Sequence, residues 1–427
     1  MKKLLLILFF AVTAIFAQPE RKPDRGIGFI RYQKLFPTVQ VLPKAGTEVT
    51  LSYLYRIPYD FLVFERDAGT FKASARMLVE VYKDDELVRR DIQDKKLSVN
   101  DFNLTQSRSL AVEGVIKFDL DADDYVIMGE FSDLQSEQLI RLAPVNIDGV
   151  EYKETGIYNP VVIKLDQSNC NGKKLPLIIN YGGSIPFNSQ DYQLVIPVSD
   201  TTAETISVEL VNNDGNQIIK TISEAYVTGI SMMECDSKLF INTNDDNQTT
   251  KNFILRDFSQ ILNEGLLLTN VTVGTDGESR EFPLSVKWVN KPLSLRNAEF
   301  AIEMLQFIEE ENVVANLLDV DSDEYPKALH NYWKKYDPTP DTEYNELMEE
   351  YYSRIDYAAM EFRGITKNNG LSTDRGKVYI RYGQPDSIER SSNDLGYVVE
   401  TWTYSSPNQK FVFVDQQGTG NFILISG

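Results

Sequence analysis

Apolar and polar residues alternate through the first third of the chain. Leu51, Tyr53 and Tyr55 form one alternating row, and a second row extends from Ala73 to Val81 before a turn of charged residues. Successive side chains of a strand point to opposite faces, so this pattern is typical of strands that are buried on one face. Several such strands broken by turns predict a first β-sandwich domain at residues 25–145.

The alternating pattern returns in the second third of the chain, after a mixed stretch at residues 146–182 that is either a crossover or the first strands of the next domain. Apolar residues alternate from Ile206 to Leu210 before an Asp-Gly pair at 214–215, and a second Asp-Gly pair at 276–277 separates two further rows. Both central residues of a tight hairpin turn need a positive φ, which Asp-Gly readily adopts. Residues 146–292 are therefore predicted to hold the crossover and a second sandwich, both sandwiches being immunoglobulin-like (Ig-like).

Beyond residue 293 the spacing of apolar residues lengthens to about 3.6, the period of an α-helix. Leu347, Tyr351 and Ile355 share one face of the clearest helix. The pattern predicts helices at 297–317, 325–336 and 342–363, then strands within 377–426, at Lys377–Tyr382, Tyr397–Tyr404, Gln409–Asp415 and Asn421–Ile425. Residues 293–427 are thus a predicted α+β C-terminal domain. The whole chain is predicted to be mainly β: two tandem β-sandwich domains, a helical segment and a small antiparallel sheet.

The first seventeen residues, 1–17, have the layout of a secretory signal peptide. Lys2 and Lys3 are positively charged, an apolar run follows, and polar residues begin after Ala17. The apolar run is too short for a bilayer core of about 30 Å, which needs roughly 20 residues. The sequence therefore predicts an exported protein, in the periplasm or outside the cell and with outer-membrane association as an option. No transmembrane segment is expected in the mature chain.

The charge of the chain bears on its partners. Asp and Glu number 63 against 43 Lys and Arg, which gives a formal net charge of −20. A surface this negative repels nucleic acid and anionic lipid headgroups. We therefore expect no nucleic-acid partner, and look for a protein or a glycan of the cell envelope; the oligomeric state stays open.

Two cysteines, Cys170 and Cys235, are 65 residues apart. An exported chain can hold a disulfide, because its compartment is oxidising. The spacing does not suit a redox or zinc pair, but sequence alone cannot place the two residues within bonding distance. A disulfide between them is one of two open outcomes.

Catalytic motifs are sparse. His330 is the single histidine, so every mechanism based on Ser-His or Cys-His would have to use it, and multi-histidine metal sites are excluded. The sequence also has no phosphate-binding loop of the G-x-x-x-x-G-K type and no G-x-S-x-G motif. A mechanism that uses two carboxylates remains open, although no pair stands out among so many acids.

Acidic stretches raise the question of calcium. Asp119, Asp121 and Asp123, with Glu130 further on, have the ligand spacing of an EF-hand loop, but Asp124 stands where the sharp turn needs Gly. Asp319, Asp321 and Asp323 form a second stretch with this spacing. It fails in the same way, because Glu324 stands where the turn needs Gly. We therefore expect no metal or other cofactor, and a Ca²⁺ site assembled from loops stays an unsupported option.

The stretch from residue 332 to residue 386 carries the most specific motifs. It reads Tyr-Trp-Lys-Lys-Tyr-Asp-Pro-Thr-Pro, then Asn-Glu at 345–346, then Gly-Leu-Ser-Thr-Asp at 370–374, and ends in Tyr-Gly-Gln-Pro-Asp. This series resembles the GWxTD domain of exported bacterial proteins, and the resemblance extends from about Leu293 to the C-terminus. Leu371 stands where the family motif has Trp. The resemblance implies upstream sandwiches and an exported protein, but it implies no established activity.

Six polar residues of this stretch are the candidate ligand- or partner-binding site: Asp337, Asn345, Glu346, Thr373, Asp374 and Arg375. Two interpretations are open. Thr373 and Asp374 can cap backbone amides, and Arg375 can pair with an acid such as Glu346 or Glu349, which would make a structural clamp between helix and sheet. Alternatively, the same residues form a surface site.

We therefore expect a non-catalytic exported envelope protein that binds a protein or glycan or acts as a structural scaffold. Whether it has enzymatic activity is uncertain, and the lack of motifs favours none. One alternative is a carboxylate-based hydrolase of envelope polysaccharide, which needs two acids in a cleft. The other is an accessory factor of a secretion or envelope assembly complex.

Overall fold

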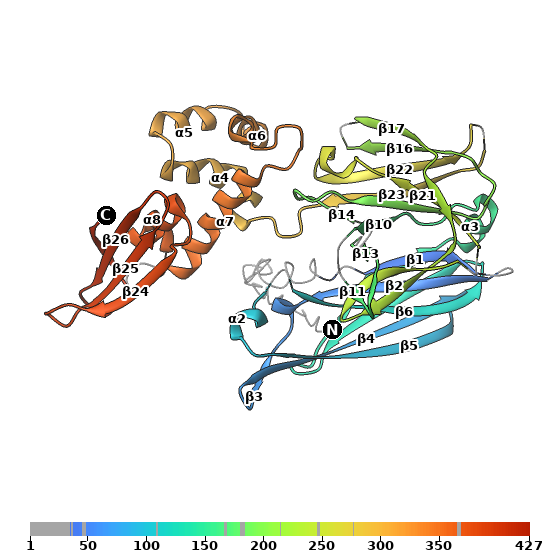
Figure 1. Ribbon diagram of the computed structural model, residues 1–427, viewed down its shortest axis with the longest axis horizontal. Helices are drawn as coiled ribbons and strands as arrows, with labels where there is room; N and C mark the ends of the chain where they lie inside the picture. Colours follow the sequence, from blue (N-terminus) through green and yellow to red (C-terminus); the bar gives the residue numbers. More distant parts are fainter. Residues whose placement is uncertain are drawn as a thin grey trace, which may run out of the picture.

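The computed structural model (Figure 1) describes residues 35–427, except for 36, 45–47, 108–109, 166–168, 180–183, 214, 246–247, 276 and 365–368. The predicted signal peptide and the start of the first predicted domain lie outside the described residues. So do Asp214 and Asp276, the first residues of the two Asp-Gly pairs. The predicted fold class is confirmed: the protein is mainly β, and its helices gather in a C-terminal segment that precedes a small antiparallel sheet.

The first part of the chain forms two antiparallel sheets. Sheet A has the order β1-β2-β6, with β1 (Thr38–Pro43), β2 (Glu48–Pro58) and β6 (Ala111–Asp121). Sheet B has the order β3-β4-β7-β8, with β5 beside β4 and β9 beside β7. Its strands are β3 (Glu65–Asp67), β4 (Thr70–Lys83), β5 (Glu86–Val99), β7 (Tyr125–Asp133), β8 (Gln138–Arg141) and β9 (Val145–Ile147). Two short helical turns, η1 (Tyr59–Phe61) and α2 (Phe102–Thr105), lie in the connections.

The second part also forms two large sheets, entered through helix α3 (Gly149–Thr155). Sheet C has the order β18-β21-β15-β10-β13-β20-β19, with β10 (Val161–Lys164), β13 (Leu177–Ile178), β15 (Gln193–Val198), β18 (Ala225–Val227), β19 (Gly229–Cys235), β20 (Lys238–Asn244) and β21 (Lys251–Leu255). Sheet E has the order β14-β23-β22-β16-β17, with β14 (Ser184–Pro186), β16 (Ile206–Asn212), β17 (Gln217–Ile222), β22 (Gly265–Val273) and β23 (Ser279–Lys287). The turn η2 (Ser259–Ile261) precedes β22.

The four sheets are stacked in the order B, A, C, E (Figure 1). In β2, Leu51 and Tyr53 pack in the core shared with sheet B, whereas Leu54 packs against sheet C. In β15, Leu194 packs toward sheet E and Val195 toward sheet A. Because the two middle sheets are covered on both faces, their strands are apolar on both faces and lose the simple alternation of a one-sided sheet.

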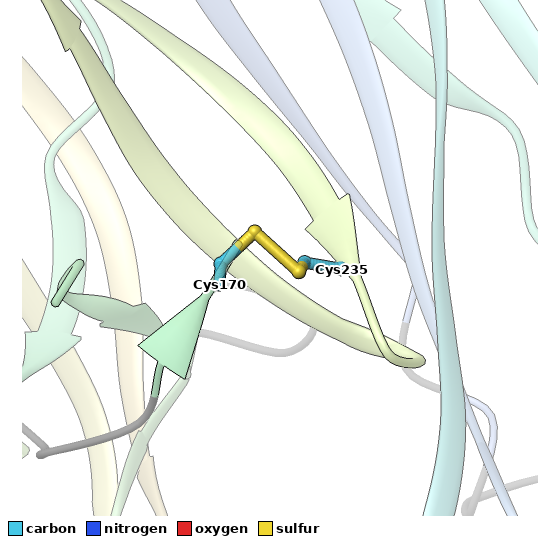
Figure 2. The surroundings of a disulfide bond; sticks show 2 residues. All are labelled: Cys170 and Cys235. Carbon is cyan, nitrogen blue, oxygen red and sulfur yellow. A yellow bond between two sulfur atoms is a disulfide. The ribbon is translucent and has the colours of Figure 1, made fainter. Parts of the chain in front are cut away.

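A disulfide joins Cys170 and Cys235, which the sequence had left open (Figure 2). Cys170 ends β11 (Asn169–Cys170), which pairs with β12 (Lys173–Lys174) in a small hairpin, and Cys235 ends β19. Their Cα atoms are 5.8 Å apart. The bond closes a 65-residue loop, which in the chain-entropy account stabilises the folded state by about 4 kcal/mol.

The C-terminal part begins with η3 (Leu293–Arg296) and continues as a helical layer beside a four-stranded sheet (Figure 1). The helical elements are α4 (Ala298–Met304), η4 (Leu305–Phe307), α5 (Glu311–Leu318), α6 (Tyr325–Trp333), η5 (Lys334–Tyr336), α7 (Glu346–Glu361), η6 (Gly370–Ser372) and α8 (Asp374–Tyr382). The strands β24 (Ser387–Ser392), β25 (Val398–Tyr404), β26 (Gln409–Asp415) and β27 (Ile423–Ser426) follow in spatial order. No helix among the described residues is long and apolar enough to cross a membrane.

The prediction of a strand at Lys377–Tyr382 is wrong, because these residues belong to α8. The alternation of Val378 and Ile380 resembles a strand, but Tyr379 also finds an aromatic partner, Tyr357 of α7, with ring centroids 4.5 Å apart. The three consecutive side chains therefore all pack against neighbouring elements, which a helix allows and a one-sided strand does not. The Thr373 hydroxyl accepts a hydrogen bond from the Gly376 amide and caps the first turn.

The predicted helix at 297–317 is divided into α4 and α5. The Met304 carbonyl accepts a hydrogen bond from the Tyr351 hydroxyl, and the Ile308 and Glu309 amides both turn to the Leu305 carbonyl. The regular helix thus ends at Met304. The helix predicted at 342–363 begins at Glu346, and Asn345 provides its N-cap. The sequence pattern did not predict the strand β24.

An aromatic cluster joins the C-terminal part to sheet E. Phe187, Trp288 and Tyr344 pack together with ring centroids 5.3–5.4 Å apart. The Glu343 amide also donates a hydrogen bond to the Gln260 carbonyl at 2.9 Å. The C-terminal helices are therefore attached to the stacked sheets by both apolar and polar contacts.

Candidate functional site

The six residues predicted as a site fall into two groups, one at each end of α7. The first group surrounds the N-terminal end. Asn345 accepts a hydrogen bond from the Met348 amide at 2.9 Å and donates one to the Trp333 carbonyl at 3.0 Å. Asp337 accepts from the Thr339 amide at 2.9 Å, and the Thr339 hydroxyl donates to Glu346 at 2.8 Å. These bonds hold the Asp-Pro-Thr-Pro turn against the start of the helix.

The second group lies near the C-terminal end of α7, about 24 Å away by the length of a 16-residue helix. The Thr373 hydroxyl donates to the Gly370 carbonyl at 2.6 Å, and Asp374 accepts from the Leu424 amide at 2.9 Å. The structure therefore does not bring the six residues together as one site. Each of the five residues described so far makes a hydrogen bond that fixes a turn, a helix start or a strand.

Arg375 pairs with Glu400, and not with Glu346 or Glu349, the two acids that the sequence offers as examples of a partner. Its guanidinium donates to Glu400 at 3.1 Å and lies over the Phe422 ring, 4.0 Å from the centroid. Glu346 and Glu349 are at the other end of α7, which is why this pairing could not form. Glu400 itself is only 1% exposed, so Arg375 satisfies a buried carboxylate.

A half-open pocket of about 320 Å³ lies between α6, α7 and α8, and the sequence did not predict it. Its lining combines aromatic rings, aliphatic side chains and charged groups, namely Ile308, Glu309, Tyr332, Trp333, Tyr336, Leu347, Glu350, Tyr351, Arg354, Ile380 and Arg381. Tyr332, Trp333 and Tyr351 are each buried to more than nine-tenths, whereas Tyr336 is half exposed. The pocket thus has a fixed aromatic floor and a more accessible wall.

The charged groups of the pocket form two clusters, each held in position by hydrogen bonds. On one side, the hydroxyls of Tyr332 and Tyr336 donate to the same oxygen of Glu309, at 2.6 and 3.4 Å. Burial raises the pKa of the Tyr332 hydroxyl, and its hydrogen bond to Glu309 adds to this rise. Tyr332 therefore remains a neutral hydrogen-bond donor at physiological pH.

On the opposite side, Arg354 bonds to Glu350 at 2.7 Å, one helical turn earlier on α7. Arg354 also donates to the Arg381 carbonyl at 3.5 Å, and Arg381 donates to the Phe307 carbonyl at 3.3 Å. A side chain at Gly383, whose φ is +79°, would meet the Arg354 guanidinium at 2.9 Å. The two cations are thus held by the domain's own groups.

The pocket and the two polar groups lie along the same ordered series of motifs, from the aromatic-Trp-Lys segment to Tyr-Gly-Gln-Pro-Asp. Residues 273–424 match the GWxTD domain. The match begins at the last residue of β22 and therefore includes β23 as well as the C-terminal helices and sheet. No curated protein matches the chain.

The motif that gives the GWxTD domain its name is a structural device in this chain. A side chain at Gly370 would meet the Ala358 carbonyl oxygen at 2.0 Å, so the backbone passes close to α7. Leu371, in the place of the motif's Trp, is buried in the domain core, which keeps the hydrophobic role without an indole. Thr373 caps α8 and Asp374 bonds to β27, as described above.

Sequence reasoning missed the pocket because its parts are far apart along the chain. Tyr332, Trp333 and Tyr336 were visible as a cluster, but an aromatic row on a helix is the common signature of a core. Glu309 comes from the segment where the predicted first helix is broken. Only that break brings its carboxylate to the rings, and nothing in the periodicity indicates the break.

Proposed function

We propose that this protein is a non-catalytic exported envelope protein whose GWxTD domain binds another component of the envelope, while the stacked sheets serve as its scaffold. The observation that carries the proposal is the half-open aromatic pocket. Binding sites are concave and mostly apolar with a few placed polar groups, and aromatic side chains are enriched in the centres of interfaces. The floor of this pocket is immobilised by packing, so a ligand would not have to order it.

Export is supported by two independent features. The first is the composition of residues 1–17, and the second is the disulfide between Cys170 and Cys235. Disulfides persist in oxidising compartments and are rare in the cytosol. Cell fractionation followed by non-reducing electrophoresis tests this part. A protein found in the cytosol with free thiols would contradict it.

Binding is favoured over hydrolysis by the state of the pocket acids. A carboxylate mechanism needs two acids in distinct roles, an acid and a base or nucleophile. Glu350 is already paired with Arg354, which leaves Glu309 as the other acid in the lining. His330 is exposed on α6 and is not among the lining residues. Release of reducing sugars from envelope polysaccharide that is lost in Glu309→Gln would replace this proposal by the hydrolase.

The docking role of the pocket is tested by filling it. Leu347 lines the pocket and is 46% exposed, and Met360 lies on the same helix outside the lining and is 52% exposed. We expect Leu347→Trp to abolish capture of partners from an envelope extract and Met360→Trp to leave it unchanged. Equal capture by both variants would place recognition elsewhere, on the sheets.

The accessory-factor alternative makes a different prediction. If the GWxTD domain docks on an assembly or secretion complex, Leu347→Trp should reduce export of that complex's cargo in living cells. Normal export together with lost capture would support the binding role alone.

A further inference from the structure

Glu309 is an acid for which the described residues of the domain supply no cation. Among the described residues, no Lys or Arg lies within ion-pair distance of its carboxylate, and the bonds that it accepts come from two tyrosine hydroxyls at one oxygen. Glu350, the other acid of the lining, is paired with Arg354. A half-buried carboxylate without a counter-charge is costly unless a partner provides one.

The rings beside Glu309 also suit a cation. Tyr332 packs against Trp333 and Tyr336 with centroids 5.3 Å apart in each case. A cation over the face of Trp or Tyr is attracted by the ring's charge distribution, and alkyl stems pack well on the same surfaces. These rings and Glu309 together form a wall that is apolar along its length and negative at one end.

The size of the pocket restricts the occupant further. A volume of about 320 Å³ is at the lower end of the range for ligand sites, about 300–1,000 Å³. It suits one long side chain rather than several sugar rings. The net charge of −20 also attracts cationic groups and repels anionic ones on approach.

We propose that the pocket of the GWxTD domain receives a Lys or Arg side chain of a partner polypeptide, with the alkyl stem on the rings of Tyr332, Trp333 and Tyr336 and the cation on Glu309. This inference rests on the proposed binding function and names the chemistry of its partner. Glu309 is then the residue that determines specificity, and Arg354 and Arg381 close the opposite side.

The three tryptophans of the chain provide a direct readout. Trp333 lines the pocket, whereas Trp288 is in the aromatic cluster at sheet E and Trp402 is buried in the C-terminal sheet. We would label the indole nitrogens of the mature protein and titrate it with Nα-acetyl-lysine methylamide at constant ionic strength. The norleucine, arginine and glutamate analogues are titrated in parallel. The Trp333 signal should shift, and the other two signals should not.

The expected result is that the lysine and arginine compounds bind at least about tenfold more tightly than the neutral norleucine compound, because a hydrogen bond to a charged group is worth that factor or more. Glu309→Gln should reduce the lysine compound to the norleucine level. Glu310→Gln is the matched control, since it removes the same charge from an exposed neighbour whose side chain forms no cap. It should change binding less than twofold.

Three results would overturn the inference. Equal losses in Glu309→Gln and Glu310→Gln would reduce the effect to net charge, and tighter binding of the glutamate compound would make the pocket an anion site at Arg381. No shift of Trp333 with any compound would show that a single side chain does not enter. None of these would affect the proposed docking role, which the Leu347→Trp capture experiment tests separately.

Discussion

Glu400 is a buried carboxylate that connects α8 with two strands of the C-terminal sheet. Its buried carboxylate accepts from Arg375 on α8 and from Arg390 on β24, and from the indole of Trp402. The two arginines differ in exposure: the side chain of Arg375 is 11% exposed and that of Arg390 is 73% exposed. Removing one partner of a buried pair leaves a charge without compensation, whereas exposed pairs contribute little.

We therefore expect Arg375→Ala to lower the free energy of unfolding of the GWxTD domain by about 3 kcal/mol. Arg390→Ala, the control, should cost less than about 1 kcal/mol. Urea denaturation followed by tryptophan fluorescence measures both. Similar costs for the two variants would mean that Arg375 is not the principal partner of Glu400.

Asp415 makes the stability of the same domain depend on pH. Burial alone would raise the pKa of this carboxyl, but hydrogen bonds from the amides of Gly420, Gln417 and Thr419 outweigh it and hold the pKa below its usual value. A lowered pKa in the folded state stabilises the fold above the unfolded value of about 3.9, and this contribution is lost as pH falls through the folded pKa.

The free energy of unfolding should therefore decrease as pH is lowered below about 4, and it should do so less steeply in Asp415→Asn. Denaturation curves between pH 3 and about pH 6 test this. Parallel pH profiles of the two proteins would assign the acid sensitivity to other carboxyls of the domain, such as Asp386, whose pKa is lowered by the hydrogen bond from the Ser405 amide.

At the scale of elements, the helix α8 separates what the sequence could predict from what it could not. Periodicity located the helices α6 and α7 and the strands β25 and β26 closely. It failed at α8, because a nine-residue amphipathic segment with alternating apolar residues fits either period. Capping by Thr373 and packing on α7 decide the outcome, and packing on α7 is a tertiary contact that a pattern does not contain.

The cap of α8 should therefore matter measurably. Thr373→Val removes both the bond from the Gly376 amide and the bond to the Gly370 carbonyl, and we expect it to destabilise the domain by about 1–2 kcal/mol. Thr373→Ser keeps the hydroxyl and should retain most of the stability. Thermal unfolding compares the two variants, and an equal loss in both would point to the methyl group rather than the cap.

The same limit applies to the candidate site. The sequence singled out residues that are structurally important, because caps and turns use the same polar side chains as binding sites do. Asn345 and Thr373 illustrate this, since each is buried and bonded to the backbone. The pocket depends on where Glu309 lies relative to Tyr332, which is set by the break after Met304. The relative position of these two side chains follows from the packed fold, and the spacing of residues along the sequence does not indicate it.

At the scale of the whole molecule, the stacking of four sheets was not evident from the sequence. A short strand such as β15 is apolar on both faces because both are covered. Its sequence does not show whether the covering sheet belongs to the same sandwich or to the next one. Glu113 of β6 strengthens the contact between sheets A and C by accepting a hydrogen bond from the Leu239 amide of β20. The two predicted sandwiches thus share an interface.

The disulfide belongs to this scale because it joins the β11–β12 hairpin to β19, the edge strand of sheet C. We expect Cys170→Ala combined with Cys235→Ala to lower the free energy of unfolding of the stacked sheets by about 4 kcal/mol. Binding at the GWxTD domain should be unchanged, since the bond joins a hairpin strand to a strand of the stacked sheets and no residue of the hairpin or of those sheets lines the pocket. Denaturation and capture measured on the same preparations test both halves. Lost capture in a folded variant would contradict the separation of scaffold and binding domain.

The bond between Asp374 and the Leu424 amide has a consequence for self-association. β27 is the last strand of its sheet, and Ile423, Leu424 and Ile425 are all exposed without a charge among them. A free, apolar strand border is a template on which other chains can add and form fibrils. By occupying one of its amides and drawing α8 alongside, Asp374 closes part of that border. We therefore expect the acid of the motif to limit self-association at high concentration, independently of any ligand.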